Sequence, residues 1–221
     1  CISSAASDVY KRQLYTLQKS MPCYLIRGNK EEYILSGIGE AHPEWDSYPS
    51  TVGMLRYARQ HLTREDLSFL EALPVTARIH IDGMKDIRIC HGTQRAVKEQ
   101  MRPGNSQNKE ILAQVAEEYM LCGHTHRVMA LQEYEKIVWN PGAVGLPSIE
   151  KRDTKTQFMI LHSDNGAWHP EFIELDYDIE QVIQEMHDTG LYETAPYWAR
   201  TTECILRGTK AVSYTHLRAH E

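Results

Sequence analysis

Three short apolar runs in this chain each end at a glycine next to a polar residue, and this repeated pattern is the feature that most limits the fold. The runs precede Gly28-Asn29, His91-Gly92 and residues 123–126, which read Gly-His-Thr-His. Short apolar runs bounded by glycine are typical of buried strands. Ligand sites in α/β proteins form beyond strand ends, where loops distant in sequence meet. The pattern therefore predicts a sheet with polar loops converging at one edge.

The periodicity of apolar residues predicts both helices and hairpins around these runs. Helical spacing is found in residues 50–62, 63–73 and 108–119, and alternating runs separated by turn residues predict hairpins over 77–90, 127–140 and 156–175. We expect two further helices in 178–206, divided by Gly190, and a buried strand at Tyr24–Ile26 with a helix starting near Glu31. Helices alternate with strands early and hairpins dominate later, which indicates a mixed α/β (α+β) fold.

Charge and hydropathy exclude several classes of partner. The net charge is -6 and the pI is near 6.0, so a broad surface for nucleic acid or anionic membrane is not expected. No apolar run approaches the roughly 20 residues that a membrane-spanning helix needs. A local basic pocket for phosphate remains compatible with this composition.

The cysteines favour a reducing compartment. Five is an odd number, and Cys23, Cys90 and Cys122 lie inside short apolar runs, which indicates buried thiols rather than a disulfide framework. We therefore expect a cytoplasmic protein.

The histidines of the Gly-His-Thr-His segment are candidate metal ligands. His124 and His126 are too close in sequence to share a helix face, but on an irregular loop they can lie on either side of a pair of metal ions. Imidazole binds Mn, Fe, Ni, Zn and Co, and an Asn carbonyl adds a neutral oxygen ligand. Structural readings stay open: His91 could be a hydrogen-bonded core histidine, and Asn29 could simply tolerate a left-handed turn.

Four strings occur in an order that resembles the calcineurin-like metallophosphoesterase superfamily, especially its small bacterial phosphodiesterases. They are "GNKE", "HGT", "GHTH" and "NPGAVG", and the resemblance covers residues 14–212. It implies a single domain with a four-layer α/β/β/α sandwich fold. It also implies a metal-dependent phosphoesterase, with a small phosphate ester as substrate, and leaves open whether the chain forms a homo-oligomer.

The resemblance also assigns ligands. By matching position, Asn29, His91 and His124 resemble the ligands of the second metal, and His126 resembles a ligand of the first. The cofactors implied are two divalent ions, with Mn expected and Fe, Ni, Zn or Co as alternatives. The turn at 140–142 resembles a structural element that positions its neighbours without binding the ions. Two cations in this family activate water for attack on phosphorus.

Two departures from the family pattern concern chemistry. Nothing before Gly28 matches the family's Asp-x-His and Gly-Asp motifs, so the carboxylate that bridges the metals is not found, and we expect the fold to be incomplete at its N-terminus. Lys30 stands where the family has a histidine that protonates the leaving group. A Lys ammonium can stabilise phosphoryl oxygens, but its ordinary pKa of about 10.4 makes it a poor general acid unless the site lowers it.

The two ends of the chain differ from the rest. Residues 1–13 and 213–221 show no apolar periodicity and resemble translated adaptor DNA, although a native tail is the alternative. For the whole chain, the expected function is hydrolysis of phosphodiesters or small phosphomonoesters, with this fragment expected to be impaired. Two alternatives remain: a noncatalytic interaction scaffold on the same fold, and a mononuclear zinc hydrolase that uses His91, His124 and His126.

Overall fold

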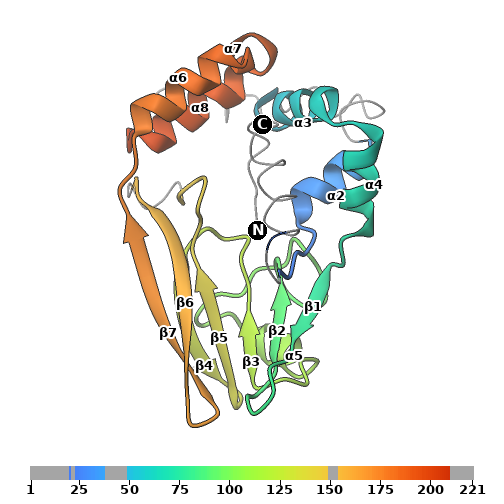
Figure 1. Cartoon of the computed structure of the whole chain (residues 1–221), viewed down its shortest axis with the longest axis vertical. Coiled ribbons are helices and arrows are strands. Elements are labelled where there is room, and N and C mark those ends of the chain that lie inside the picture. The colour runs from blue at the N-terminus through green and yellow to red at the C-terminus, as the bar shows by residue number, and fades with distance from the viewer. Residues whose placement is uncertain (1–19, 21–22, 38–48, 149–153, 210–221) are drawn as a thin grey trace.

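A five-stranded mixed sheet is the larger of two sheets in the computed structural model, which describes residues 20, 23–37, 49–148 and 154–209 (Figure 1). In spatial order the strands are β1 (Thr76–Ile79), β2 (Ile87–Cys90), β3 (Tyr119–Leu121), β5 (Lys136–Pro141) and β4 (Val128–Glu133). β2, β3 and β5 run parallel, whereas β1 and β4 pair antiparallel with their neighbours. The carboxyl ends of the three parallel strands therefore lie at one edge of the sheet.

A separate hairpin forms a second β layer. It consists of β6 (Thr156–Asp164) and β7 (Ala167–Leu175), joined by Asn165 and Gly166 with φ values of 48° and 80°. Positive φ at both positions matches the turn that two-residue hairpins favour. Met159 and Phe172 of this hairpin pack against a cluster on one face of the five-stranded sheet, made by Ile87, Ile89, Tyr119 and Trp139.

The opposite face of the sheet is covered by the segment that contains α5 (Asn108–Leu112). Ile111 and Leu112 are fully buried there against Met120 and Val138. The sheet is thus apolar on both faces, which explains why its central strands read as continuous apolar runs rather than alternating ones.

The remaining described helices lie beyond the carboxyl ends of the parallel strands (Figure 1). They are α2 (Asn29–Leu35), α3 (Pro49–His61), α4 (Arg64–Ala72), α6 (Ile179–Asp188), α7 (Leu191–Thr194) and α8 (Pro196–Leu206). We call α3, α6, α7 and α8 the helical cap, because they share one apolar cluster of Tyr57, Ile183, Met186, Leu191, Ala195, Ala199 and Leu206. α2, α3 and α4 share a second cluster built around Ile34, Met54, Leu55, Ala58 and Leu62. Within the described parts of the chain, no helix is long and apolar enough to cross a membrane.

Most of the predicted elements are confirmed. The three hairpins form where turn residues indicated them, and α4 begins with a capping box between Thr63 and Asp66. In this box the Asp66 N–H donates to Thr63 Oγ1 and the Thr63 N–H donates to Asp66 Oδ2. The helix expected over 108–119 is shorter, since α5 ends at Leu112.

Four expectations are corrected. Tyr24–Ile26 is irregular rather than a strand, because no described strand pairs with it, and Cys23 is exposed rather than buried. α2 begins at Asn29, two residues before the expected start. The tail holds three described helices and not two, because Pro196 starts α8 directly after the short α7. The expectations for residues 1–13 and 213–221 concern positions outside the described residues.

Candidate metal centre

His91 contacts two of the other predicted ligands, Asn29 and His124, at the carboxyl edge of the sheet. Asn29 is the first residue of α2, His91 directly follows β2, and His124 lies three residues after β3. His91 Nε2 lies 2.8 Å from Asn29 Oδ1 and 3.2 Å from His124 Nδ1. Segments 62 and 33 residues apart in the chain therefore place three potential metal-binding atoms within hydrogen-bonding distance.

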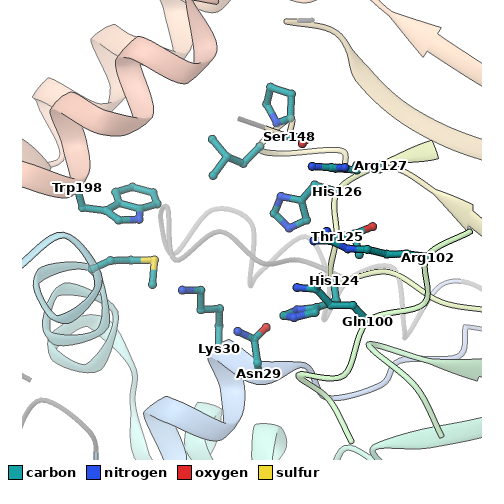
Figure 2. Close-up of a pocket in the computed structure, with 13 residues that line it drawn as sticks. Asn29, Lys30, Gln100, Arg102, His124, Thr125, His126, Arg127, Ser148 and Trp198 are labelled. Carbon is teal, nitrogen blue, oxygen red and sulfur yellow. The ribbon is translucent and has the colours of Figure 1, made fainter. Parts of the chain in front are cut away.

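The fourth predicted ligand, His126, faces the same cavity. Asn29, His124 and His126 all line a cavity of about 380 Å³ between the strand ends and the helices (Figure 2). His91 is only 2% exposed and lies behind Asn29 and His124. The structure thus brings Asn29, His91 and His124 together and places His126 at the same cavity, while their role as ligands stays a prediction.

The backbone of the histidine segment is unusual. His124 and His126 have φ values of 64° and 54°, a left-handed conformation that is uncommon outside glycine and is found at functional sites. Fully buried Asn140 holds this segment: its amide donates to the Gly123 carbonyl at 2.7 Å and to Thr125 Oγ1 at 3.1 Å. These bonds agree with the predicted structural role of the turn at 140–142.

Gly28 allows the close approach of α2 and His91. A Cβ atom at this position would lie 2.9 Å from His91 Nδ1, closer than carbon and nitrogen can pack. The Gly28 N–H donates to Glu31 Oε2 at 2.8 Å, so the Glu31 side chain satisfies one backbone donor at the start of α2. The absence of a side chain at Gly28 therefore lets α2 come close enough to His91 for the Asn29 side chain to reach its ring.

The environment keeps the three imidazoles neutral. Burial, helped by the nearby His124 and His126, lowers the pKa of His91 to about 3. Burial also lowers the pKa of His124 and of His126, which outweighs the opposing effect of hydrogen bonds to the Lys98 and Leu146 backbones. A neutral ring keeps one nitrogen with a lone pair that can bind a cation, whereas His91 Nε2 donates to Asn29 Oδ1 and would have to lose its proton to do so.

Lys30 lies beside the histidines and lines the same cavity. Its positive charge contributes to the lowered pKa values of His124 and His126. Burial lowers the pKa of Lys30 itself, and the adjacent Glu31 carboxylate partly opposes this shift. The direction is the one that a proton-donating lysine would need.

The donors fit a divalent transition metal in type, but their arrangement does not form a complete site. One amide oxygen and three neutral imidazoles suit Mn, Fe, Ni, Zn or Co. Over the described ranges, however, no group of three or more His, Cys, Asp or Glu side chains has the spacing to hold a metal ion. Asn29, His91 and His124 would therefore hold a cation with further ligands from elsewhere.

Motif reasoning missed several residues of the cavity. Arg102, Arg127, Ser148 and Trp198 line it together with the predicted ligands (Figure 2). Arg127 directly follows the Gly-His-Thr-His motif, so its position was a usable signal. Trp198 lies in α8, far along the chain and outside any motif, and only tertiary packing brings it here.

The chain belongs to the calcineurin-like phosphoesterase superfamily: the superfamily domain matches residues 4–166. This confirms the resemblance seen in the motifs and the α/β metallophosphoesterase fold. It also supports a general phosphoesterase function, in a class of proteins that generally bind divalent metals. No curated protein gives a match to the chain.

Solved structures agree with this fold. The chain is similar to hypothetical protein PH1004 from Pyrococcus horikoshii, with 21% identity and a TM-score of 0.71, over 91% of this chain and 79% of that one. It is also similar to a metallophosphoesterase from Sphaerobacter thermophilus, with 18% identity and a TM-score of 0.65, over 87% and 82% of the two chains. At these identities the likeness concerns the fold alone.

Proposed function

We propose that this protein is a metal-dependent phosphoesterase that hydrolyses phosphodiesters or small phosphomonoesters. The observation that carries the proposal is the contact of Asn29 Oδ1, His91 Nε2 and His124 Nδ1 at the end of the parallel strands. Neutral donors from three separate segments meet there beside a cavity with basic side chains. One such contact would also suit a hydrogen-bonded core histidine, but an amide oxygen and imidazoles from three separate segments beside one cavity favour cation binding.

The side chains divide into two roles. Asn29, His91, His124 and His126 would hold the cation, while Lys30, which lines the same cavity, would bind the phosphoryl oxygens. A bound cation would supply positive charge to these oxygens and would acidify a water molecule. Lys30 adds a point charge, and its lowered pKa favours proton donation to the leaving oxygen.

We propose two divalent ions, with Mn as the expected metal. The described residues that line the cavity include no Asp or Glu that could bridge two ions. The number of bound ions is therefore tested separately from the activity. Two ions per chain by inductively coupled plasma mass spectrometry support a dinuclear site. One tightly held zinc supports instead the mononuclear alternative with His91, His124 and His126.

The function is tested with the full chain and a chromogenic phosphodiester, bis(4-nitrophenyl) phosphate, in Mn buffer. We expect weak turnover, because the carboxylate that bridges the metals is not found in the sequence, and we expect His124→Ala to abolish it and to weaken Mn binding in calorimetry by at least about tenfold. His162→Ala is the matched control, because His162 pairs with Glu171 on the exposed hairpin. No turnover with any divalent metal, at either a diester or a monoester, would contradict the proposal.

A noncatalytic scaffold is the second candidate. The absence of a carboxylate among the described lining residues, together with Lys30 in place of the family histidine, favours it. A scaffold would show neither turnover nor a change in metal binding on His124→Ala, so the same assay separates the two functions.

We also propose a cytoplasmic location. The four described cysteines are all unpaired, and burial raises the pKa of the Cys122 thiol to about 12. Such thiols need no oxidising compartment. Fractionation of the source cells would place the protein directly.

A further inference from the structure

The cavity is larger than a phosphate group requires. Its volume of about 380 Å³ falls within the roughly 300–1,000 Å³ that is usual for pockets that hold organic ligands. A phosphate bound beside the histidines leaves most of this space to the rest of the substrate. The lining of the remaining space therefore bears on which ester the protein accepts.

One side of the cavity suits an anion. Arg102 and Arg127 line it, Lys30 extends into the cavity between this side and Trp198 (Figure 2), and no acidic side chain is among the described lining residues. In Figure 2 both arginines lie on the same side as His124 and His126. Positive charge is thus concentrated around the candidate metal ligands, and the phosphate end of a substrate belongs on this side.

The other side is apolar and carries an aromatic ring. Trp198 of α8 extends its indole into the cavity across from the histidines (Figure 2). Met54, Leu146 and Pro147 line the cavity as well. A tryptophan face is a suitable surface for a flat ring, because π-systems stack in offset or edge-on geometries.

The indole is held in position before any ligand binds. Trp198 is half-buried and packs against both apolar clusters of the helices, the one with Leu191 and the one with Leu55. Tryptophan has few rotatable bonds, so little conformational entropy is lost when a ligand contacts it. The position of the ring is therefore determined by the fold.

We propose that the substrate is a small phosphoester that carries a flat aromatic group, which packs on Trp198 while its phosphate lies near Lys30, Arg102 and Arg127. The inference rests on the proposed function, since it takes the phosphate position from that function and adds the chemistry of the other end. A nucleobase and a simple aryl ring share this chemistry. Trp198 is then a specificity-determining residue.

The test compares two phosphonates, which resist hydrolysis because their phosphorus is bonded to carbon. Phenylphosphonate and methylphosphonate are titrated into the full chain in Mn buffer by isothermal titration calorimetry. We expect phenylphosphonate to bind about tenfold more tightly, the size of effect that stacking on one aromatic side chain gives. The phosphonate analogue of adenosine 5′-monophosphate forms a third arm: binding tighter than phenylphosphonate assigns a nucleobase, and weaker binding assigns a smaller aryl group.

Three variants connect the preference to the indole. Trp198→Leu keeps apolar packing and is expected to bring the phenyl to methyl affinity ratio close to one, whereas Trp198→Phe keeps most of it. Tyr197→Leu is the matched control, since Tyr197 precedes Trp198 on α8, is 50% exposed and does not line the cavity. If Trp198→Leu does not fold, the fluorescence of wild-type and Trp198→Phe proteins gives the answer: phenylphosphonate should change the emission of the wild type only.

Several results would overturn the inference. Equal affinity of the two phosphonates for the wild type would refute the aromatic preference and leave the phosphoesterase proposal standing. An unchanged affinity ratio in Trp198→Leu would place the aromatic group elsewhere. If neither phosphonate binds, the proposed phosphate position near Lys30, Arg102 and Arg127 is also refuted, whatever the activity assay shows.

Discussion

The two sides of the cavity are held in place in different ways. On the histidine side, individual hydrogen bonds determine the geometry: buried Asn140 holds Gly123 and Thr125, and the backbone of His124 is left-handed. On the opposite side, Trp198 is positioned by the packing of the helical cap, with buried side chains such as Leu191. One side depends on single polar atoms and the other on accumulated apolar area.

Because of this difference, we expect substitutions on the two sides to affect metal binding and the free energy of unfolding separately. Hydrophobic burial contributes about 25 cal/mol per Å² and is spread over many residues, so a loss in the cap should lower the free energy of unfolding while the histidines keep their geometry. A lost hydrogen bond near the histidines changes less total energy but misplaces a ligand atom. Substitutions on each side in turn can show whether the two sides are independent.

The largest effect on stability is expected in the cap. Leu191 is 1% exposed at the centre of the cap cluster, so Leu191→Ala should lower the free energy of unfolding by about 2–5 kcal/mol. Mn affinity should be unchanged, because no atom near His124 is lost. Urea denaturation followed by circular dichroism, with calorimetry for Mn, measures both. Leu175→Ala, at a residue that is 49% exposed, is the control with a small effect on either quantity.

A loss of Mn affinity beyond about tenfold in Leu191→Ala would show that the cap positions the metal ligands. The two sides would then be one cooperative unit, and the comparison would fail. A lower affinity for phenylphosphonate in this variant, by contrast, would not contradict the comparison, since Trp198 packs on the same cluster.

A smaller effect on stability but a larger one on binding is expected at Asn140. Asn140→Ala removes the bonds of its amide to the Gly123 carbonyl and Thr125 Oγ1 and leaves the Gly142 N–H without its acceptor, which together should cost about 1–3 kcal/mol of unfolding free energy. The histidine segment loosens, so Mn affinity should fall by about 10–100-fold. Denaturation and calorimetry measure the two changes.

The control for Asn140 is Asn165→Gly at the tip of the β6–β7 hairpin. Asn165 has a φ of 48°, a conformation that glycine adopts freely, so neither stability nor Mn affinity should change much. Unaltered Mn affinity in Asn140→Ala would mean that the left-handed backbone of His124 holds its geometry without this side chain.

Sequence reasoning located the histidine side because its signals are local. His91 and His124 closely follow apolar runs, and parallel strands bring such positions to one edge of a sheet. The motif order then added Asn29. What the sequence did not contain is the arrangement of atoms, in which His91 Nε2 lies between Asn29 Oδ1 and His124 Nδ1.

The other side could not be predicted because it depends on tertiary packing. Trp198 belongs to a helix in the tail, and nothing in its neighbourhood indicates that α8 packs on α3 above the strand ends. The wrong prediction of a strand at Tyr24–Ile26 has the same cause. An apolar run can suit a strand, but it becomes one only where a partner strand is available, and that is a property of the whole fold.

The smallest effects are expected at two glycines, which differ in why they are glycine. Gly83 has a φ of 78°, and a Cβ atom added there would meet nothing within 4 Å, so Gly83→Ala should cost about 1 kcal/mol through backbone strain alone. Gly28 has an ordinary φ of -106°, but its Cβ would lie 2.9 Å from His91 Nδ1. Gly28→Ala should also cost about 1 kcal/mol, in this case through crowding.

Only Gly28→Ala should weaken Mn binding, because only there does the added methyl displace a ligand ring. Equal Mn affinity of the two variants in calorimetry would show that His91 can move without loss, and would remove it from the ligand set.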